Sequence, residues 1–86
     1  MRFQGAVVRE QGVTFAVVVV QRHVIDNSSE ANQAIASFRP VFPGMPITLM
    51  AQDHRGRATY YGRSDISRFL AGVPVGAIPW REYTLN

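Results

Sequence analysis

The stretch from Val13 to Val20 reads Val-Thr-Phe-Ala-Val-Val-Val-Val, and six of its eight residues are valine or phenylalanine. These residue types suit a pleated, closely packed surface, so the stretch predicts a β-strand. Alternate residues of a strand point to opposite faces of a sheet, and here both alternating sets are apolar. A strand that is apolar on both faces is expected in the middle of a sheet, or with its second face covered by a partner.

The length and composition of the chain indicate one small globular domain. It has 86 residues, of which 47% are hydrophobic, and it contains no cysteine, so neither a disulfide framework nor a thiolate zinc site is expected. Its longest apolar run is far shorter than the roughly 20 residues that a membrane helix needs. The first residues lack the apolar segment of a secretory signal. We therefore expect a cytoplasmic domain that does not enter a membrane.

The basic residues are unusual in kind rather than in number. All nine are arginine, and against six acidic residues they give a formal net charge of +3. The planar guanidinium group suits phosphate and carboxylate recognition better than the lysine ammonium does. A coding bias of the source organism would produce the same composition, so the charge alone indicates nucleic-acid binding only weakly.

The first half of the chain, residues 1–39, predicts two strands and a helix. Residues 2–10 form the first strand, and Gln11-Gly12 predicts a tight hairpin turn into the Val13 strand, which we expect to continue through Val24. Asn27 with Glu30 three residues later fits a capping box at a helix start. Apolar residues then follow at helical spacing until the helix ends before the proline at position 40.

A proline-rich connector, residues 40–46, leads to the second half, residues 47–86. Strands are expected at 47–52 and 58–61, with a polar turn between them, and Ser64 is expected to cap a short second helix. The tail from Ala77 to Leu85 predicts a fifth strand or an extended segment docked by Trp80. Because Pro79 cannot donate to a ladder, such a strand would lie at a sheet edge.

The predicted architecture is an α+β two-layer sandwich. Its sheet has four or five mainly antiparallel strands in the order ββαββα plus the tail, and both helices lie on one face. That arrangement would leave one apolar face of the long strand uncovered, which is typical of an interface. The uncovered set would be Ala16, Val18 and Val20, or the alternate set that contains Phe15. We expect Ala16, Val18 and Val20 to form a self-association face in a homodimer; the alternative is that the C-terminal tail with Trp80 folds over this face.

The second hairpin and its exit hold the best candidates for binding. Cationic side chains on a protruding turn can contact phosphates, and exposed aromatic side chains can stack bases or anchor a protein interface. A hairpin tip is also commonly charged simply because it is wet. The candidate binding residues are Arg55, Arg57, Tyr60, Tyr61, Arg63, Arg68 and Trp80.

Signals for catalysis are weak. His23 with Asp26, and His54 beside Asp53, could suggest acid–base chemistry, but neighbouring residues on a strand point to opposite faces. The sequence around Ser64 lacks the second glycine of a nucleophile elbow, and two isolated histidines have no metal-ligand spacing. We expect no catalytic residue, metal or cofactor. The sequence favours a non-enzymatic, self-associating protein-interaction module; the alternative is a nucleic-acid-binding module that uses the second hairpin.

Overall fold

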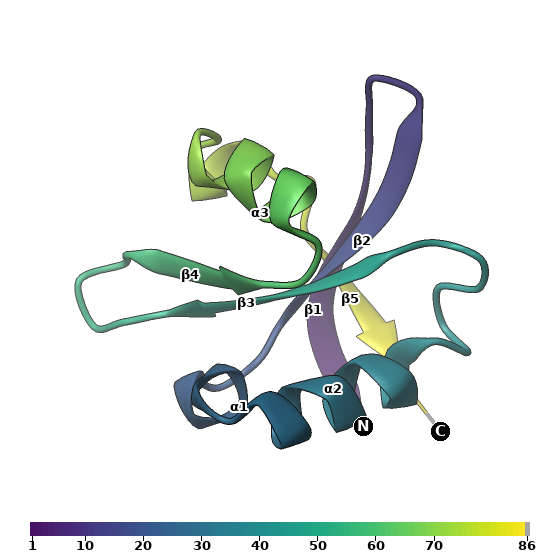
Figure 1. The fold of residues 1–86 in the computed structure, drawn as a ribbon, viewed down its shortest axis with the longest axis vertical. Helices are drawn as coiled ribbons and strands as arrows, with labels where there is room; N and C mark the ends of the chain where they lie inside the picture. Colours follow the sequence, from purple (N-terminus) through teal and green to yellow (C-terminus); the bar gives the residue numbers. More distant parts are fainter. Residues whose placement is uncertain (86) are drawn as a thin grey trace.

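The computed structural model describes residues 1–85 and has one five-stranded sheet with helices packed against it (Figure 1). Its elements, in chain order, are β1 (Arg2–Glu10), β2 (Val13–Val19), α1 (Arg22–Asp26), α2 (Ser28–Phe38), β3 (Ile47–Gln52), β4 (Ala58–Tyr61), α3 (Ser64–Ala71), the short 3-10 helix η1 (Val75–Ala77) and β5 (Arg81–Thr84). Asn86, the last residue of the predicted second half, lies outside the described residues.

The long valine strand is the central strand, as its two apolar faces predict. The strand order is β4-β3-β2-β1-β5. Three neighbouring pairs are antiparallel, whereas β2 and β3 are parallel. A parallel pair needs a long crossover connection, which the segment containing α1 and α2 supplies. The fold is therefore α+β with a mostly antiparallel, mixed sheet.

The predicted first hairpin and the predicted edge strand are both present. Gln11 and Gly12 have φ values of 50° and 79°, so both turn residues adopt the left-handed conformation of a tight two-residue hairpin. The fifth strand pairs with the first residues of β1 at the sheet edge. Reciprocal backbone hydrogen bonds between Met1 and Leu85, of 2.8 and 2.9 Å, hold the two ends of the described chain together.

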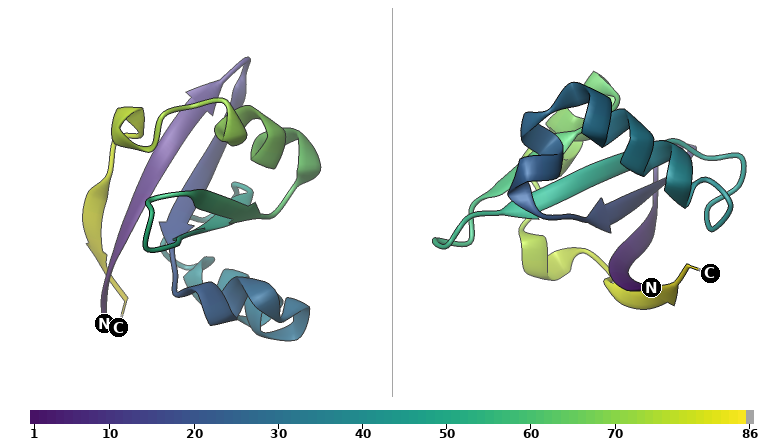
Figure 2. Two further views of the ribbon diagram at one scale, coloured as in Figure 1. Left: turned by 90° about the vertical axis from the view of Figure 1, so that its left-hand side faces the viewer. Right: turned by 90° about the horizontal axis from the view of Figure 1, so that it is seen from below.

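The prediction that both helices lie on one face is wrong. Figure 2 shows α1 and α2 on one side of the sheet and α3 on the other. Two separate clusters of buried residues agree with this arrangement: Val18 and Leu49 pack with residues of α2, whereas Val17 and Met50 pack with residues of α3. Because adjacent strand residues point to opposite faces, the two helices must cover opposite faces. The molecule has three layers rather than two.

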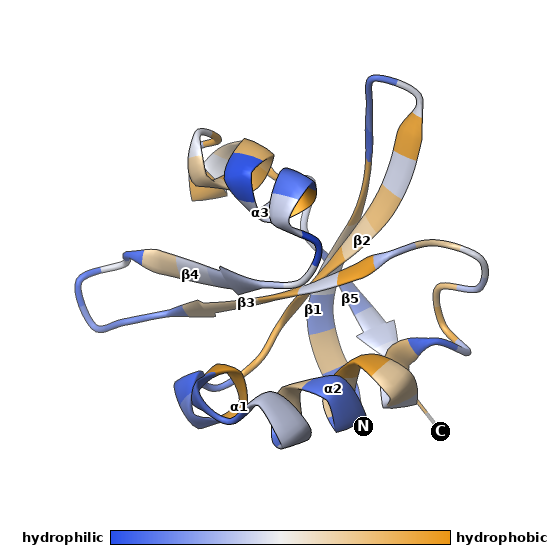
Figure 3. Ribbon diagram, viewed as in Figure 1, coloured by the Kyte–Doolittle hydropathy of each residue, from blue (hydrophilic) through white to orange (hydrophobic). Residues whose placement is uncertain are grey.

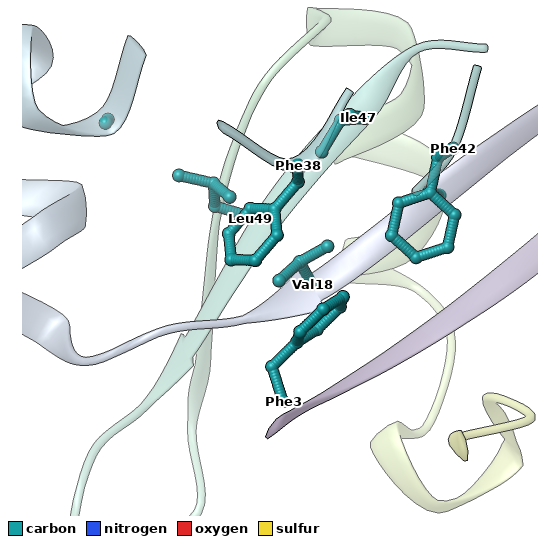
Figure 4. Packing of buried hydrophobic residues seen from close by; sticks show 8 residues of the cluster. Phe3, Val18, Phe38, Phe42, Ile47 and Leu49 are labelled. Carbon is teal, nitrogen blue, oxygen red and sulfur yellow. The ribbon is translucent and has the colours of Figure 1, made fainter. Parts of the chain in front are cut away.

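Aromatic rings dominate the core beneath α2 (Figure 4). Phe3 of β1 lies against Phe38 at the end of α2, with ring centroids 4.6 Å apart, and stacks on Tyr83 of β5 at 5.6 Å. Phe42, from the proline-rich connector, packs edge-on against Tyr83 at 5.0 Å. The connector is thus part of the core, and it joins the two halves into a single folded unit.

The core on the other face joins α3 to the sheet and to the C-terminal tail. Ile66 and Leu70 of α3 pack with Phe15 of β2 and with Ile78 of the tail. Trp80 borders this cluster, and its indole N–H donates a 2.9 Å hydrogen bond to the Val75 carbonyl. The tail therefore both docks through Trp80 and continues into an edge strand.

The start of α2 was predicted correctly from the sequence, whereas the cap of α3 and the presence of α1 were not. The Asn27 side chain accepts a 3.1 Å hydrogen bond from the Glu30 amide, which confirms the predicted cap of α2. Ser64 is the first residue of α3, and its expected capping role is wrong because the cap position is Arg63. The predicted extension of β2 is also wrong: it ends at Val19, and residues 22–26 form α1.

The exit from β4 passes very close to β3. Gly62 follows β4, and a Cβ atom at this position would lie 2.7 Å from the Thr48 hydroxyl and 3.1 Å from the Thr48 Cα. Thr48 is completely buried, and its hydroxyl has no hydrogen-bond partner among the described residues. The chain can turn from β4 into α3 along this path because residue 62 has no side chain.

We expect Gly62→Ala to lower the free energy of unfolding by about 1–3 kcal/mol, because the new methyl group overlaps buried atoms of Thr48. Urea denaturation followed by circular dichroism would measure the change. The matched control is Gly76→Ala, where nothing lies within 4 Å of the new Cβ, and it should change stability by less than about 0.5 kcal/mol. Equal effects of the two substitutions would show that the close approach at Gly62 is unimportant.

Candidate functional site

The open edge of β4 is the least protected part of the sheet. β4 is the last strand on its side and pairs within the sheet only with β3 among the described residues. Its sequence, Ala-Thr-Tyr-Tyr, contains neither a charged residue nor a proline. Natural sheets commonly protect their edges with charged residues or proline, because an exposed edge can pair with another chain. The β4 edge therefore offers free backbone groups to a partner.

The pairing register identifies which backbone groups are free. The Met50 carbonyl accepts a hydrogen bond from the Val20 amide, so the backbone groups of Met50 point toward β2. Tyr60 lies opposite Met50, and in an antiparallel pair of this kind both residues direct their backbone groups away from each other. The N–H and C=O of Tyr60 consequently point outward. By alternation, those of Ala58 do the same.

The opposite edge of the sheet carries charges. On the far side, β5 includes Arg81 and Glu82 and is preceded by Pro79. β5 covers only residues 2–5 of β1, and the uncovered end of β1 finishes in Arg9 and Glu10. These features disfavour pairing with another strand at both places. β4, by contrast, combines β-prone residues with no charge along its whole length.

A groove of about 500 Å³ lies where β4 ends, between α2 and the start of α3. One wall is a single face of α2, formed by Asn32, Ile35 and Arg39 at helical spacing. The opposite wall is the chain from Tyr61 to Arg63. Ile47 of β3 also borders the groove. The groove therefore combines apolar surface with two guanidinium groups.

The two arginines of the groove differ in their partners. Arg63 binds Asp65 through two hydrogen bonds of 2.7 and 3.1 Å, which raise the pKa of Arg63 and lower that of Asp65. Within residues 1–85, Arg39 is exposed and forms no ion pair. Arg39 is thus the cation of the groove that is available to an anionic ligand.

The tip of the second hairpin is tightly ordered by one carboxylate. Asp53 Oδ1 accepts hydrogen bonds from the backbone amides of Arg55, at 2.8 Å, and Arg57, at 3.0 Å. The bond from Arg57 lowers the pKa of Asp53 most, loss of hydration opposes this effect, and the bond from Arg55 adds to the lowering. Both hydrogen bonds to Asp53 come from backbone amides, and the positive charge of Arg57 also contributes to the lower pKa of Asp53. Both arginines are exposed on the hydrophilic hairpin tip (Figure 3).

The predicted aromatic binding residues are held by the two cores. Tyr61 is half-buried against the α2 core, and its hydroxyl donates to Asn32 Oδ1 at 3.1 Å. Tyr60 packs on the α3 side, where burial raises the pKa of its phenol. Trp80 is half-buried and hydrogen-bonded as described above. Arg68 lies elsewhere, in a groove between the first hairpin and α3 that it shares with Phe69 and Glu10.

The expectation of an uncovered face at Ala16, Val18 and Val20 is corrected by the packing. Ala16 and Val18 are completely buried, and Val20 is half-buried against the α2 core. α2 folds back over this set of side chains. An interface through Ala16 and Val18 would require the removal of α2, so any self-association must use another surface.

The histidines are held apart at the surface. His23 contacts Glu30 at 2.9 Å and Gln21 at 2.8 Å, whereas His54 sits on the second hairpin tip. In the part of the chain that the structure describes, no group of three or more His, Cys, Asp or Glu side chains could hold a metal ion. Over the same residues, no helix is both long and apolar enough to cross a membrane.

Comparisons with known proteins identify no relative. No family model matches the chain, and no curated protein or solved structure matches it significantly. The functional argument therefore rests on the geometry of the β4 edge and its groove. Sequence reasoning missed Arg39 because, taken alone, it is one arginine among nine; its spacing from Asn32 and Ile35 on one helix face was the available signal.

We expect the order of the second hairpin to depend on pH in acid solution. The pKa of Asp53 is lower in the folded protein than its usual value of 3.8. Its contribution to stability is therefore complete above pH 3.8 and is lost as the pH falls through the lowered pKa. NMR titration of the Asp53 carboxyl carbon should give a midpoint below 3.8, and the protection of the Arg55 and Arg57 amides against hydrogen exchange, relative to an unfolded chain at the same pH, should fall below it.

A midpoint at or above the usual value would contradict the two hydrogen bonds to Asp53. Asp53→Asn serves as the control, because it keeps an acceptor oxygen but cannot titrate. In that variant the exchange of the Arg55 and Arg57 amides should lose this pH-dependent step.

Proposed function

We propose that the protein is a non-enzymatic protein-interaction module that binds an extended segment of a partner protein by adding it as a strand to the β4 edge. The observation that carries this proposal is the uncharged β4, whose outer edge pairs with no other strand among residues 1–85 and whose Ala58 and Tyr60 backbone groups point outward. Strand addition derives its affinity from main-chain hydrogen bonds and its selectivity from pockets for alternate side chains. The groove beside Tyr61 is such a pocket.

The packing of the sheet favours binding of a partner at the β4 edge rather than on a sheet face. Both faces of β2 are packed against helices of the same chain, and Phe15 to Val18 are each at most 1% exposed. The homodimer expected from the sequence stays a prediction. A second copy of the chain could also pair with β4 through an edge of its own sheet. The proline variants described below distinguish that case.

We expect a capped ten-residue peptide of alternating threonine and glutamine to bind β4 with a dissociation constant on the order of 1 mM. This value corresponds to a few main-chain hydrogen bonds of about 1 kcal/mol each. In NMR titrations, the largest shifts should occur at the Ala58 and Tyr60 amides. Ala58→Pro removes one outward donor without removing a hydrogen bond to β3, so it should abolish binding.

The matched control is Thr84→Pro on the opposite edge. Thr84 lies opposite Arg2, one residue from the hydrogen-bonded pair of Met1 and Leu85, so its amide also points outward. This variant should bind the peptide as the parent protein does. Loss of binding in both variants, or in neither, would contradict strand addition at β4. A concentration-dependent dimer that Ala58→Pro disrupts in sedimentation measurements would assign the edge to a second copy.

A second candidate function is nucleic-acid binding through the second hairpin. It is supported by the exposed Arg55 and Arg57, which form no ion pair within residues 1–85. Tyr60 and Tyr61 are half-buried in the two cores, which weakens the expected base stacking. Phosphate contacts remain the available mode of binding.

For this candidate, we expect micromolar binding of labelled DNA or RNA that weakens steeply between about 50 and 200 mM salt. The double variant Arg55→Ala/Arg57→Ala should weaken binding alike for all sequences and reduce the salt slope by about 2. Fluorescence anisotropy would measure both effects, with Arg9→Ala/Arg81→Ala as a control of equal charge. An unchanged slope in the hairpin variant would exclude the hairpin as the contact.

A further inference from the structure

We infer that the strand added at β4 is acidic, and that a glutamate or aspartate side chain of the partner binds Arg39 in the groove between α2 and the end of β4. This inference rests on the proposed strand addition and specifies its partner. It is based on the position of the open β4 edge, which leads into the groove beside α2 where Arg39 carries the available positive charge.

The groove has the composition of a side-chain pocket with one anchoring cation. Its aliphatic surface comes from Ile35 and Ile47, and Asn32 is already engaged by the Tyr61 hydroxyl. Of its two guanidinium groups, that of Arg63 is bound on two nitrogens by Asp65. Arg39, at the end of α2, has no such partner among residues 1–85. A carboxylate is the ligand that a free guanidinium binds best among peptide side chains.

The position of the groove fits an alternating peptide. A strand paired with the outward groups of Ala58 and Tyr60 would direct every second side chain toward the α2 side of the sheet. Tyr61 lies on that side, since its hydroxyl reaches Asn32 of α2. A side chain directed to the same side near the end of β4 would thus meet the wall formed by Ile35 and Arg39.

The charges near β4 also favour an acidic partner strand over a second copy of this chain. β4 contains no acidic residue, and Arg57 and Arg63 bracket it in the sequence. The β4 strand of a second copy would therefore bring no carboxylate to Arg39, whereas an acidic strand would.

The test compares three capped ten-residue peptides in which threonine alternates with glutamate, glutamine or lysine. We expect the glutamate peptide to bind about fivefold more tightly than the glutamine peptide, as for a partly exposed ion pair, and the lysine peptide to bind most weakly. The advantage of glutamate should shrink between about 50 and 200 mM salt. A glutamine peptide with a free C-terminal carboxylate should gain little, because the carboxylate that we propose is a side chain.

Variants of the protein locate the effect. Arg39→Gln should make the glutamate and glutamine peptides bind equally while leaving the glutamine peptide unchanged. Arg81→Gln removes an equal charge from the opposite edge and should preserve the preference for glutamate. The Ala58→Pro variant should bind neither peptide.

The outcomes separate this inference from the proposed function. Equal binding of the glutamate and glutamine peptides to the parent protein, with both abolished by Ala58→Pro, would overturn the acidic partner and retain strand addition. A preference for glutamate that survives Arg39→Gln would overturn the role assigned to Arg39. A gain confined to the free C-terminal carboxylate would assign the groove to a chain end instead. If no peptide binds, both the inference and strand addition are overturned.

Discussion

The central strand β2 requires apolar cover on both of its faces, and the rest of the structure follows from that requirement. Phe15, Ala16, Val17 and Val18 are each at most 1% exposed, so water is excluded from both sides of the strand. A chain of 86 residues meets this requirement with α1 and α2 on one face and α3 on the other. α2 covers Ala16 and Val18, and α3 covers Phe15 and Val17. Both faces of β2 are thereby removed from the surface from Phe15 to Val18.

The same constraint creates the candidate site. Because α2 lies on one face and α3 on the other, the chain must pass from β4 across the sheet edge to reach α3. Gly62 makes that passage possible against the buried Thr48, and Arg63 follows it at the start of α3. The groove forms between this passage and α2, which returns over the opposite face. Its position beside an uncharged edge strand is therefore a consequence of covering β2 on both sides.

Several particulars of the site could be predicted from the sequence and others could not. The second hairpin and the exposure of Arg55 and Arg57 follow from local turn chemistry, since polar residues and glycine separate two strand-like runs. The environments of Tyr60 and Tyr61 do not, because their neighbours on α3 and α2 are distant in the sequence. Arg39 was missed for a similar reason. Nothing close to it in the chain distinguishes it from the other arginines, and its importance arises from residues 61–63 on the opposite wall.

The sequence by itself determined most of the elements: the two hairpins, the helix capped by Asn27, the tight turn at Gln11-Gly12 and an edge position for any strand in the tail, but not α1 or the end of β2. These depend on periodicity, glycine and proline, and on hydrogen bonds within a few residues. Only the tertiary structure decided which face each helix covers, and with it the burial of Ala16 and Val18. Both faces of β2 are equally apolar, so the pattern required cover on each side without specifying its source. The path of the chain after Gly62 supplied α3 as the second cover, and β4 was left as the last strand on its side of the sheet.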